Sequence, residues 1–234
     1  MNKYWFTNKE ITKVLCEKFK NSQNILEIGP GTEPFPLANY FIDNQDWGVD
    51  KTVIDIDIDK DAIPFPDNFF DFIYCRHVLE DIQNPDFLLK EIIRTSKAFY
   101  IETPSPLVEI TRNIDAAGFY TMYNNNIYRG YIHHKSLLTV DSNHIHIIPK
   151  FPCIEYIDFT EELEQQIIEI LKNKIYWNTY YLCEDTNKVK DIIVYKHGLN
   201  FKLNYGSYKD LIISMLNKNI LNTNAFFTHN KINI

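Results

Sequence analysis

The chain lacks the residues and segments that are typical of secreted or membrane proteins. Its cysteines are few and lie far apart in the sequence, so no close pair suggests a disulfide framework. The N-terminal residues carry lysines among aromatic side chains instead of the long apolar core of a signal peptide. No apolar run approaches the roughly 18 residues that are needed to cross a membrane. These absences predict a soluble protein in a reducing compartment, and we expect it to be cytoplasmic.

Positive charge is also in short supply. The sequence has 24 Lys and Arg against 31 Asp and Glu, a formal net charge of -7, so extended nucleic-acid binding is not expected. At 234 residues and 45% hydrophobic, the chain can bury one full core. We therefore predict a single domain over residues 1–221 with a C-terminal tail at 222–234, and a small molecule as its partner.

Glycine is rare as well, but two of the seven glycines lie in one motif, Ile25-Leu-Glu-Ile-Gly-Pro-Gly-Thr32. It reads as a buried strand and a turn in which Gly29 and Gly31 would let a ligand reach the main chain. The dinucleotide fingerprint would require another glycine where Pro34 stands, and no Lys-Ser/Thr pair follows as a phosphate loop. NAD and ATP are therefore disfavoured. Glu27 favours a cationic ligand through Coulomb attraction.

A second motif lies downstream, Asp61-Ala-Ile-Pro-Phe-Pro-Asp-Asn-Phe-Phe-Asp71. Together with the glycine turn it resembles the class I S-adenosylmethionine-dependent methyltransferases, in particular the small-molecule type 11-like group. The resemblance extends from about Gln23 to Glu102. It implies an α/β fold with a Rossmann-like, doubly wound sheet that is mostly parallel and closes with a C-terminal antiparallel hairpin. It also implies S-adenosylmethionine as cofactor and S-adenosylhomocysteine as product.

The same resemblance implies roles for individual residues. In the family, the glycine turn lies against the methionine part of the cofactor and an acidic residue ending the second strand holds the ribose; here that residue would be Asp50. An Asp after the third strand reaches the adenine amino group, and Asp55, Asp57, Asp59 and Asp61 all remain candidates, with Asp61 as the direct match. The implied cofactor-binding residues are Glu27, Gly29, Pro30, Gly31, Asp50, Asp61, Ala62 and Cys75.

The spacing of the two aspartates departs from the family pattern. Only ten residues separate Asp50 from Asp61, whereas a parallel crossover usually needs about a dozen or more. We predict that the helix between strands two and three is lost. Residues 52–58 then form a compressed connection or a short strand.

Hydrophobic periodicity predicts the remaining elements. Helices are expected at residues 7–19, 35–42, 86–95, 158–173 and 209–221, the fourth opening with a capping box. Strands are expected at residues 24–28, 70–74, 98–102, 175–183 and 191–196. The alternation of strand and helix in the first half is typical of a parallel, doubly wound sheet.

Residues 103–152 are predicted to be an inserted lid that selects the substrate, because a site at the ends of parallel strands is otherwise open. Aromatic and cationic side chains gather in it, although they could equally serve to pack an irregular segment. The predicted substrate-binding residues are Arg76, Tyr128, Arg129, Tyr131, His133 and His134. No metal site is predicted, since the histidines of this region have no carboxylate or cysteine at a recognised ligand spacing.

The predicted catalytic residue is His77, which directly follows the fourth strand and has a near-neutral intrinsic pKa. Alternatively, His77 shapes the cofactor pocket and Arg76 or Glu80 orients the substrate. The segment Cys75-Arg-His-Val78 differs from the D/N-P-P-Y/F loop of enzymes that methylate base amino groups, so that activity is disfavoured.

The sequence thus predicts methyl transfer to a small-molecule acceptor, achieved mainly by binding and in-line alignment. A non-catalytic methyltransferase-like module that binds a partner protein is the alternative. A nicotinamide-dependent oxidoreductase is a third hypothesis, weakened by the missing glycine.

Overall fold

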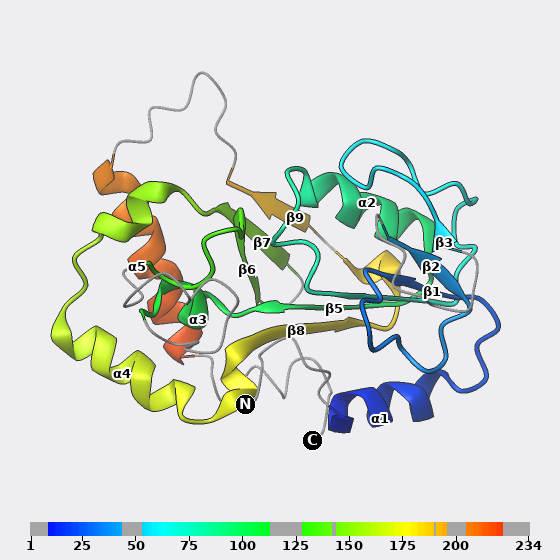
Figure 1. Ribbon diagram of the computed structural model, residues 1–234, viewed down its shortest axis with the longest axis horizontal. Coiled ribbons are helices and arrows are strands. Elements are labelled where there is room, and N and C mark those ends of the chain that lie inside the picture. The colour runs from blue at the N-terminus through cyan, green and yellow to red at the C-terminus, as the bar shows by residue number, and fades with distance from the viewer. Residues whose placement is uncertain are drawn as a thin grey trace.

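The computed structural model of the protein describes residues 9–43, 53–112, 128–141, 144–189, 191–195 and 205–221. Within them the chain forms a six-stranded sheet, in the order β3-β2-β1-β4-β5-β8, and a three-stranded sheet, in the order β6-β7-β9 (Figure 1). The predicted α/β class is confirmed, as is a large sheet that is mostly parallel.

The parallel strands of the larger sheet are short and almost wholly buried. Its sixth strand runs antiparallel to β5, with Phe99 opposite Cys183. The strands are β1 (Ile25–Ile28), β2 (Tyr40–Ile42), β3 (Val53–Ile54), β4 (Phe72–Arg76), β5 (Phe99–Pro104) and β8 (Asn178–Cys183).

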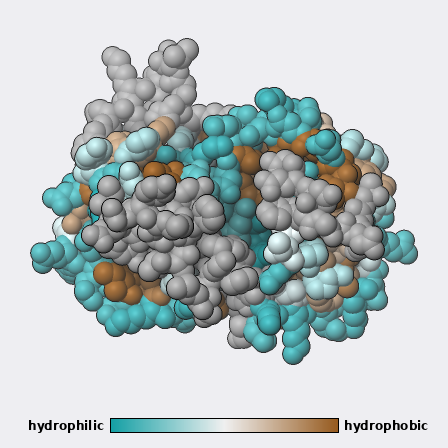
Figure 2. Space-filling view, viewed as in Figure 1, coloured by the Kyte–Doolittle hydropathy of each residue, from teal (hydrophilic) through white to brown (hydrophobic). Residues whose placement is uncertain are grey.

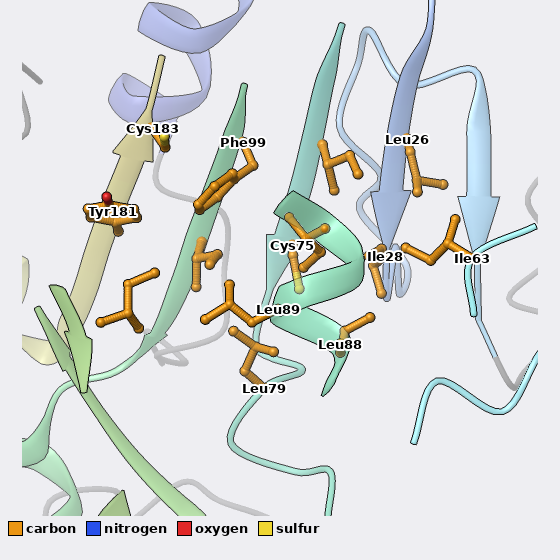
Figure 3. Close-up of a cluster of buried hydrophobic side chains, with 14 of the residues drawn as sticks. Leu26, Ile28, Ile63, Cys75, Leu79, Leu88, Leu89, Phe99, Tyr181 and Cys183 are labelled. Atoms are coloured by element: carbon orange, nitrogen blue, oxygen red, sulfur yellow. The ribbon is translucent and has the colours of Figure 1, made fainter. Parts of the chain in front are cut away.

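Different helices cover the two faces of the larger sheet. In β1, Leu26 and Ile28 pack with α2 (Pro85–Thr95), whereas Ile25 packs with α1 (Lys9–Phe19). Side chains of a strand alternate between faces, and β4 and β5 divide in the same way between the two clusters. Figure 3 shows the α2 side, where apolar side chains of the strands and helix meet. The sheet is therefore a buried layer between two helices, as its continuous apolar strands require.

The rest of the chain forms a second cluster of elements beside β5 and β8 (Figure 1). Three helices, α3 (Pro106–Ile110), α4 (Glu161–Leu171) and α5 (Tyr205–Leu221), share a core with the smaller sheet. The strands of this sheet are β6 (Ser136–Asp141), β7 (His144–Pro149) and β9 (Asp191–Val194). Short 3-10 helices span Pro152–Tyr156, Lys174–Trp177 and Thr186–Lys188. The predicted insertion thus contains a β-hairpin, β6–β7, which the sequence patterns did not predict.

The helix predicted at residues 35–42 is wrong. The end of this segment is β2, which pairs with β1, and the residues before it form turns. Pro36 has no N–H to donate, and the side chain of Asn39 accepts a hydrogen bond from the main chain of Ile25 at 2.8 Å. These contacts fix an extended approach to the sheet, so β1 and β2 are joined without a helix.

The predicted C-terminal hairpin needs a correction in its pairing. β8 closes the larger sheet as an antiparallel strand, as expected, but β9 pairs in parallel with β7 in the smaller sheet.

The start of the helix predicted at residues 158–173 also differs, since the side chain of Thr160, not Asp158, caps α4 by accepting from Leu163 N at 3.3 Å. The helices predicted at residues 7–19, 86–95 and 209–221 are confirmed as α1, α2 and α5 within the described residues.

Residues 43–52 join β2 to β3, and of these the structure describes only Asp43. Asp50 lies outside the described residues. Among the helices that are described, none combines the length and the apolarity required to span a membrane. On the face seen in Figure 2, the coloured hydrophobic residues form small separate patches among hydrophilic ones.

Candidate functional site

A cavity of about 730 Å³ lies where β1, β2 and β4 reach their carboxyl ends. In parallel α/β sheets this edge is where ligands bind, since the loops leaving the strands diverge there. The cavity is lined by Gly29, Pro30, Gly31, Thr32, Glu33, Ile42, Asp43, Asp55, Ile56, Asp57, Ile58, Asp59, Arg76, His77, Val78, Asp81, Ile82 and Lys135.

The glycine turn forms one wall, and both glycines have backbone angles that favour glycine, with φ of 71° at Gly29 and 54° at Gly31. A Cβ atom at Gly29 would collide with the side chain of Val78, whereas one at Gly31 would have no atom within 4 Å. Gly29 N also donates to Ile42 O at 2.9 Å, which fastens the turn to β2. The predicted cofactor-binding residues Gly29, Pro30 and Gly31 all face the cavity.

Glu27 lies behind this wall, with 1% of its surface exposed. Its Oε2 accepts a hydrogen bond from Phe35 N at 2.7 Å, so it holds the far end of the loop that carries the glycines. The carboxylate does not line the cavity. Its observed contact is with the protein's own backbone.

Another part of the cavity wall is acidic. Asp43 directly follows β2, and Asp55, Asp57 and Asp59 follow β3 with Ile56 and Ile58 between them, as the list of lining residues shows. The sequence analysis did not single out Asp43, because it placed the second strand too late in the chain. The sequence nonetheless contains a pattern that could have identified Asp43, because this acidic residue directly follows the apolar tripeptide of residues 40–42.

Asp61 and Ala62 are not among the residues that line the cavity. Asp61 instead closes the turn before it, its Oδ2 accepting from Asp57 N at 2.9 Å. A hydrogen bond from Lys60 lowers the pKa of Asp57, so the Asp57 carboxylate is ionised at neutral pH.

Cys75 and Arg76 end β4 but differ in environment. Cys75 is buried in the core under α2, where burial raises the pKa of its thiol far above the usual range. Arg76 lines the cavity, together with Lys135 from the segment before β6. The cavity lining therefore includes two cationic side chains besides its aspartates.

His77 begins the loop after β4 in a left-handed conformation, with φ of 54°, and its N–H donates to Glu102 O at 2.8 Å. Its Nδ1 lies 3.2 Å from Glu80 Oε1 and its Nε2 lies 3.4 Å from Glu102 Oε1. Burial alone would lower the pKa of His77, but the two carboxylates outweigh it and raise the pKa to about 9. The imidazole is then cationic at neutral pH, which does not suit a general base.

Glu102 is itself fully engaged within the sheet. Tyr100 donates its hydroxyl to Glu102 Oε2 at 2.7 Å, and Asn178 donates from β8 to Oε1 at 2.8 Å. Next to this carboxylate, burial raises the pKa of the Tyr100 phenol well above its ordinary value. His77 is thus anchored to a polar network that connects β5 and β8.

Arg129 is buried away from the cavity. Its guanidinium donates to Ile110 O at 2.8 Å and to Ile157 O at 3.1 Å, and it lies 4.6 Å from the ring centroid of Phe159. These contacts join α3 to the segment before α4. Tyr128, which is exposed, likewise does not line the cavity.

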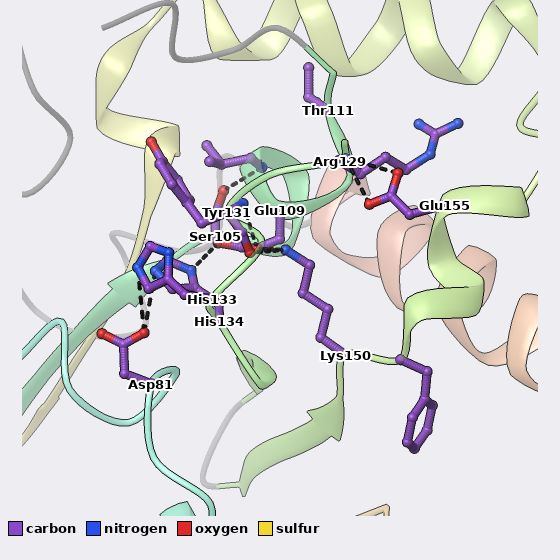
Figure 4. Close-up of polar contacts among 12 residues, drawn as sticks. Asp81, Ser105, Glu109, Thr111, Arg129, Tyr131, His133, His134, Lys150 and Glu155 are labelled. Atoms are coloured by element: carbon purple, nitrogen blue, oxygen red, sulfur yellow. Dashed lines mark hydrogen bonds and ion pairs between the residues drawn. The ribbon is translucent and has the colours of Figure 1, made fainter. Parts of the chain in front are cut away.

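The pair His133–His134 lies near the cavity, beside Asp81 (Figure 4). His134 Nδ1 is 2.6 Å from Glu109 Oε1, and Lys150 Nζ is 2.5 Å from Glu109 Oε2. Burial alone would raise the pKa of Glu109, but His134 and Lys150 reverse this and lower it to about 2. Lys150 also donates to Tyr131 O at 2.7 Å. Asp81, Glu109 and Lys150 are the members of this group that the sequence analysis missed.

The sequence was compared with protein families and with curated proteins. A family described as a methyltransferase domain matches residues 6–151, which is more than half of the 234 residues. No curated protein matches the sequence.

Several solved structures are similar in fold. An S-adenosylmethionine-dependent methyltransferase from Mesorhizobium loti is 18% identical with a TM-score of 0.32, over 37% of this chain and 49% of that one. A possible histamine N-methyltransferase from Thermotoga maritima is 17% identical with a TM-score of 0.36, over 44% and 54%. The N-terminal domain of EvdMO1 with S-adenosylhomocysteine bound is 17% identical with a TM-score of 0.35, over 44% and 52%. The chain thus spans about half the length of these structures.

Proposed function

The chain belongs to the methyltransferase domain family, and from this premise we propose that it transfers a methyl group from S-adenosylmethionine to a small-molecule acceptor. The observation that carries the proposal is the cavity of about 730 Å³, which is lined by the glycine turn and by the aspartates that follow β2 and β3. Its size is within the range of about 300–1,000 Å³ that is usual for small-ligand sites.

The cavity walls fit the cofactor. Gly29 and Gly31 both line the cavity, and the space beside the main chain at Gly31 is open, whereas a side chain at Gly29 would displace Val78, which also lines the cavity. The carboxylates of the acidic wall suit the sulfonium and the hydroxyl groups of the cofactor. When bound, the cofactor supplies an activated methyl group.

Within this wall we assign the ribose hydroxyls to Asp43, because it directly follows β2 and faces the cavity. Asp55, Asp57 and Asp59, with Ile56 and Ile58, offer a polar and apolar surface for the adenine. Asp50, which the resemblance implies for the ribose, stays a prediction outside the described residues.

Positioning is the chain's main contribution to methyl transfer, since a donor that is already activated requires alignment more than proton transfer. His77, held cationic between Glu80 and Glu102, fixes the loop after β4. Arg76 and Lys135 line the cavity. They suit an acceptor that carries an anionic or hydroxyl group.

Calorimetric titration with S-adenosylmethionine, S-adenosylhomocysteine and NADH tests the proposal. We expect micromolar binding of the first two and none of NADH. Asp43→Asn should weaken cofactor binding by about tenfold or more, the cost of a lost charge-assisted hydrogen bond. Asp158→Asn, which makes the same chemical change at an exposed position, is the matched control.

Failure of both sulfur compounds to bind would contradict the proposal and favour a non-catalytic module. Binding of NADH alone would favour an oxidoreductase. If both sulfur compounds bind, a screen of acceptors with anionic or hydroxyl groups follows, read out by formation of S-adenosylhomocysteine.

A further inference from the structure

Three potential ligand atoms from two distant segments converge at the edge of the cavity. The Nε2 atoms of His133 and His134 lie 3.6 Å and 3.7 Å from Asp81 Oδ1. All three groups have ligand atoms within 4.8 Å of one another. Figure 4 shows both imidazoles directed at the same carboxylate.

These separations are too long for good hydrogen bonds, whose donor and acceptor atoms lie about 2.7–3.2 Å apart. Among the described residues, Asp81 Oδ1 is buried and has no hydrogen-bond partner. A buried carboxylate oxygen without such a partner is costly. Asp81 Oδ1 thus has two ion-pair contacts and no hydrogen bond, and a metal ion shared with the two imidazoles would give it a direct partner.

A metal ion fits the spacing. Ligand atoms bound at about 2.0–2.2 Å to a tetrahedral Zn²⁺ lie roughly 3.3–3.5 Å from one another. The two observed distances, 3.6 Å and 3.7 Å, are only slightly longer. The separation of the two imidazole nitrogens from each other is at most 4.8 Å, so the three side chains would draw together around the ion.

The surroundings of His134 are those of a metal ligand. Its Nδ1 faces Glu109 Oε1 at 2.6 Å, which leaves Nε2 directed at Asp81. Histidine ligands commonly donate their other ring N–H to a carboxylate in this way. Lys150 holds the second oxygen of Glu109 at 2.5 Å, so the supporting carboxylate is itself fixed.

The backbone keeps this arrangement in place. Gly130 has a φ of 55°, and a Cβ there would lie 2.5 Å from Glu109 Cα and O. Only glycine allows this close approach. It brings the segment with the two histidines against α3, which carries Glu109.

We propose that Asp81 Oδ1, His133 Nε2 and His134 Nε2 bind a divalent transition metal, with Zn²⁺ as the best fit. Nitrogen and carboxylate donors in a set of three are typical of zinc sites that keep one coordination position open. Glu109 is a positioning residue for this site, because it acts through His134.

The open position indicates what the metal does. Asp81 is also part of the cavity wall, as are Arg76 and Lys135. The metal would accept an oxygen or nitrogen of the acceptor and hold it at the cavity edge. This last step rests on the proposed methyl transfer, whereas the metal site itself does not.

Metal binding to the full chain is the test. After treatment with a chelator, the protein is titrated with Zn²⁺ by calorimetry, and with Co²⁺ to record the visible absorption of a four-coordinate ion. We expect one ion per chain. His133→Asn and Asp81→Asn should each weaken Zn²⁺ binding by about tenfold or more, and Glu109→Gln by about 10- to 100-fold.

His144→Asn, which removes a histidine of β7, is the matched control and should bind Zn²⁺ as the parent does. Circular dichroism verifies that each variant is folded. The His133 side chain is 37% exposed, so His133→Asn should fold even if variants at more buried positions do not. The metal site can then be tested with His133→Asn alone.

Absence of stoichiometric Zn²⁺ binding, or equal affinity in His133→Asn and His144→Asn, would overturn the metal site. A parallel titration with S-adenosylmethionine separates the two proposals. If Zn²⁺ binds as expected and the cofactor does not, the methyl-transfer proposal fails and the metal site stands.

Discussion

The Nδ1 atom of His77 lies 3.2 Å from Glu80 Oε1, so an imidazolium that is 11% exposed and a buried carboxylate meet directly after β4. Glu102 completes the arrangement from β5, with its Oε1 atom 3.4 Å from His77 Nε2. An ion pair buried in this way is costly to break from one side, because the remaining charge has no compensation. The cation at His77 therefore contributes to stability.

The first prediction concerns pH. The pKa of His77 is raised from 6.5 to about 9 in the folded protein, so its contribution to stability is fully present below pH 6.5 and is lost as pH rises through about 9. The shift corresponds to roughly 3 kcal/mol in the free energy of unfolding. Urea denaturation between pH 6 and pH 10 measures it.

His77→Gln removes the titrating group and serves as the reference for other groups that ionise in this range. The parent should lose more stability than His77→Gln over the window. Parallel pH profiles for the two proteins would show that His77 is not held as a cation.

The second prediction distinguishes two ways in which alanine would destabilise the glycine turn, backbone strain and a steric collision. Alanine at Gly29 or Gly31 would have to adopt a positive φ, which costs about 1 kcal/mol in either case. At Gly29 the new methyl group would also collide with Val78, whereas at Gly31 it has open space. We expect Gly29→Ala to lose more stability and more cofactor affinity than Gly31→Ala, by urea denaturation and calorimetry. Equal losses would mean that the contact with Val78 is relieved without cost.

The third prediction concerns the buried acceptor at Glu27. Glu27→Ala leaves the N–H of Phe35 without the oxygen that accepts from it at 2.7 Å, which should cost about 1–3 kcal/mol in the free energy of unfolding. Glu27→Gln retains an oxygen at that position and should restore most of this loss. If glutamine is no better than alanine, the charge rather than the hydrogen bond supports the loop.

The fourth prediction treats Arg129 as a structural residue. Arg129→Ala removes the donors to Ile110 O and Ile157 O and should destabilise the fold by about 2 kcal/mol or more. Its effect on cofactor affinity, measured on folded protein, should be small. Arg76→Ala should show the reverse, a small change in stability with weaker binding of the acceptor. A specific loss of cofactor binding in Arg129→Ala would contradict this assignment.

Much of the larger sheet could be predicted from the sequence, because local patterns suffice for it. The apolar run before Gly29, the amphipathic pattern of α1 and the Asn-Pro start of α2 each specify their element without help from distant residues. The helix predicted at residues 35–42 is wrong because the local pattern there is ambiguous. Its prolines are compatible with a helix start, and only pairing with β1 makes residues 40–42 a strand.

Some of the residues that line the cavity could likewise be predicted from the sequence. The glycine turn is contiguous in sequence, so its role could be inferred from spacing alone. Asp43 was missed, because its relevance depends on where β2 ends.

The sequence by itself determined the α/β class, the mostly parallel sheet and the glycine turn of a methyltransferase domain. Only the tertiary structure decided which charged groups meet. Asp81 reaches His133 and His134 across more than fifty residues of chain, and Glu102 reaches Asn178 across 76. No local pattern encodes such contacts, because they arise when the packing of separate buried elements brings their polar side chains to the same place.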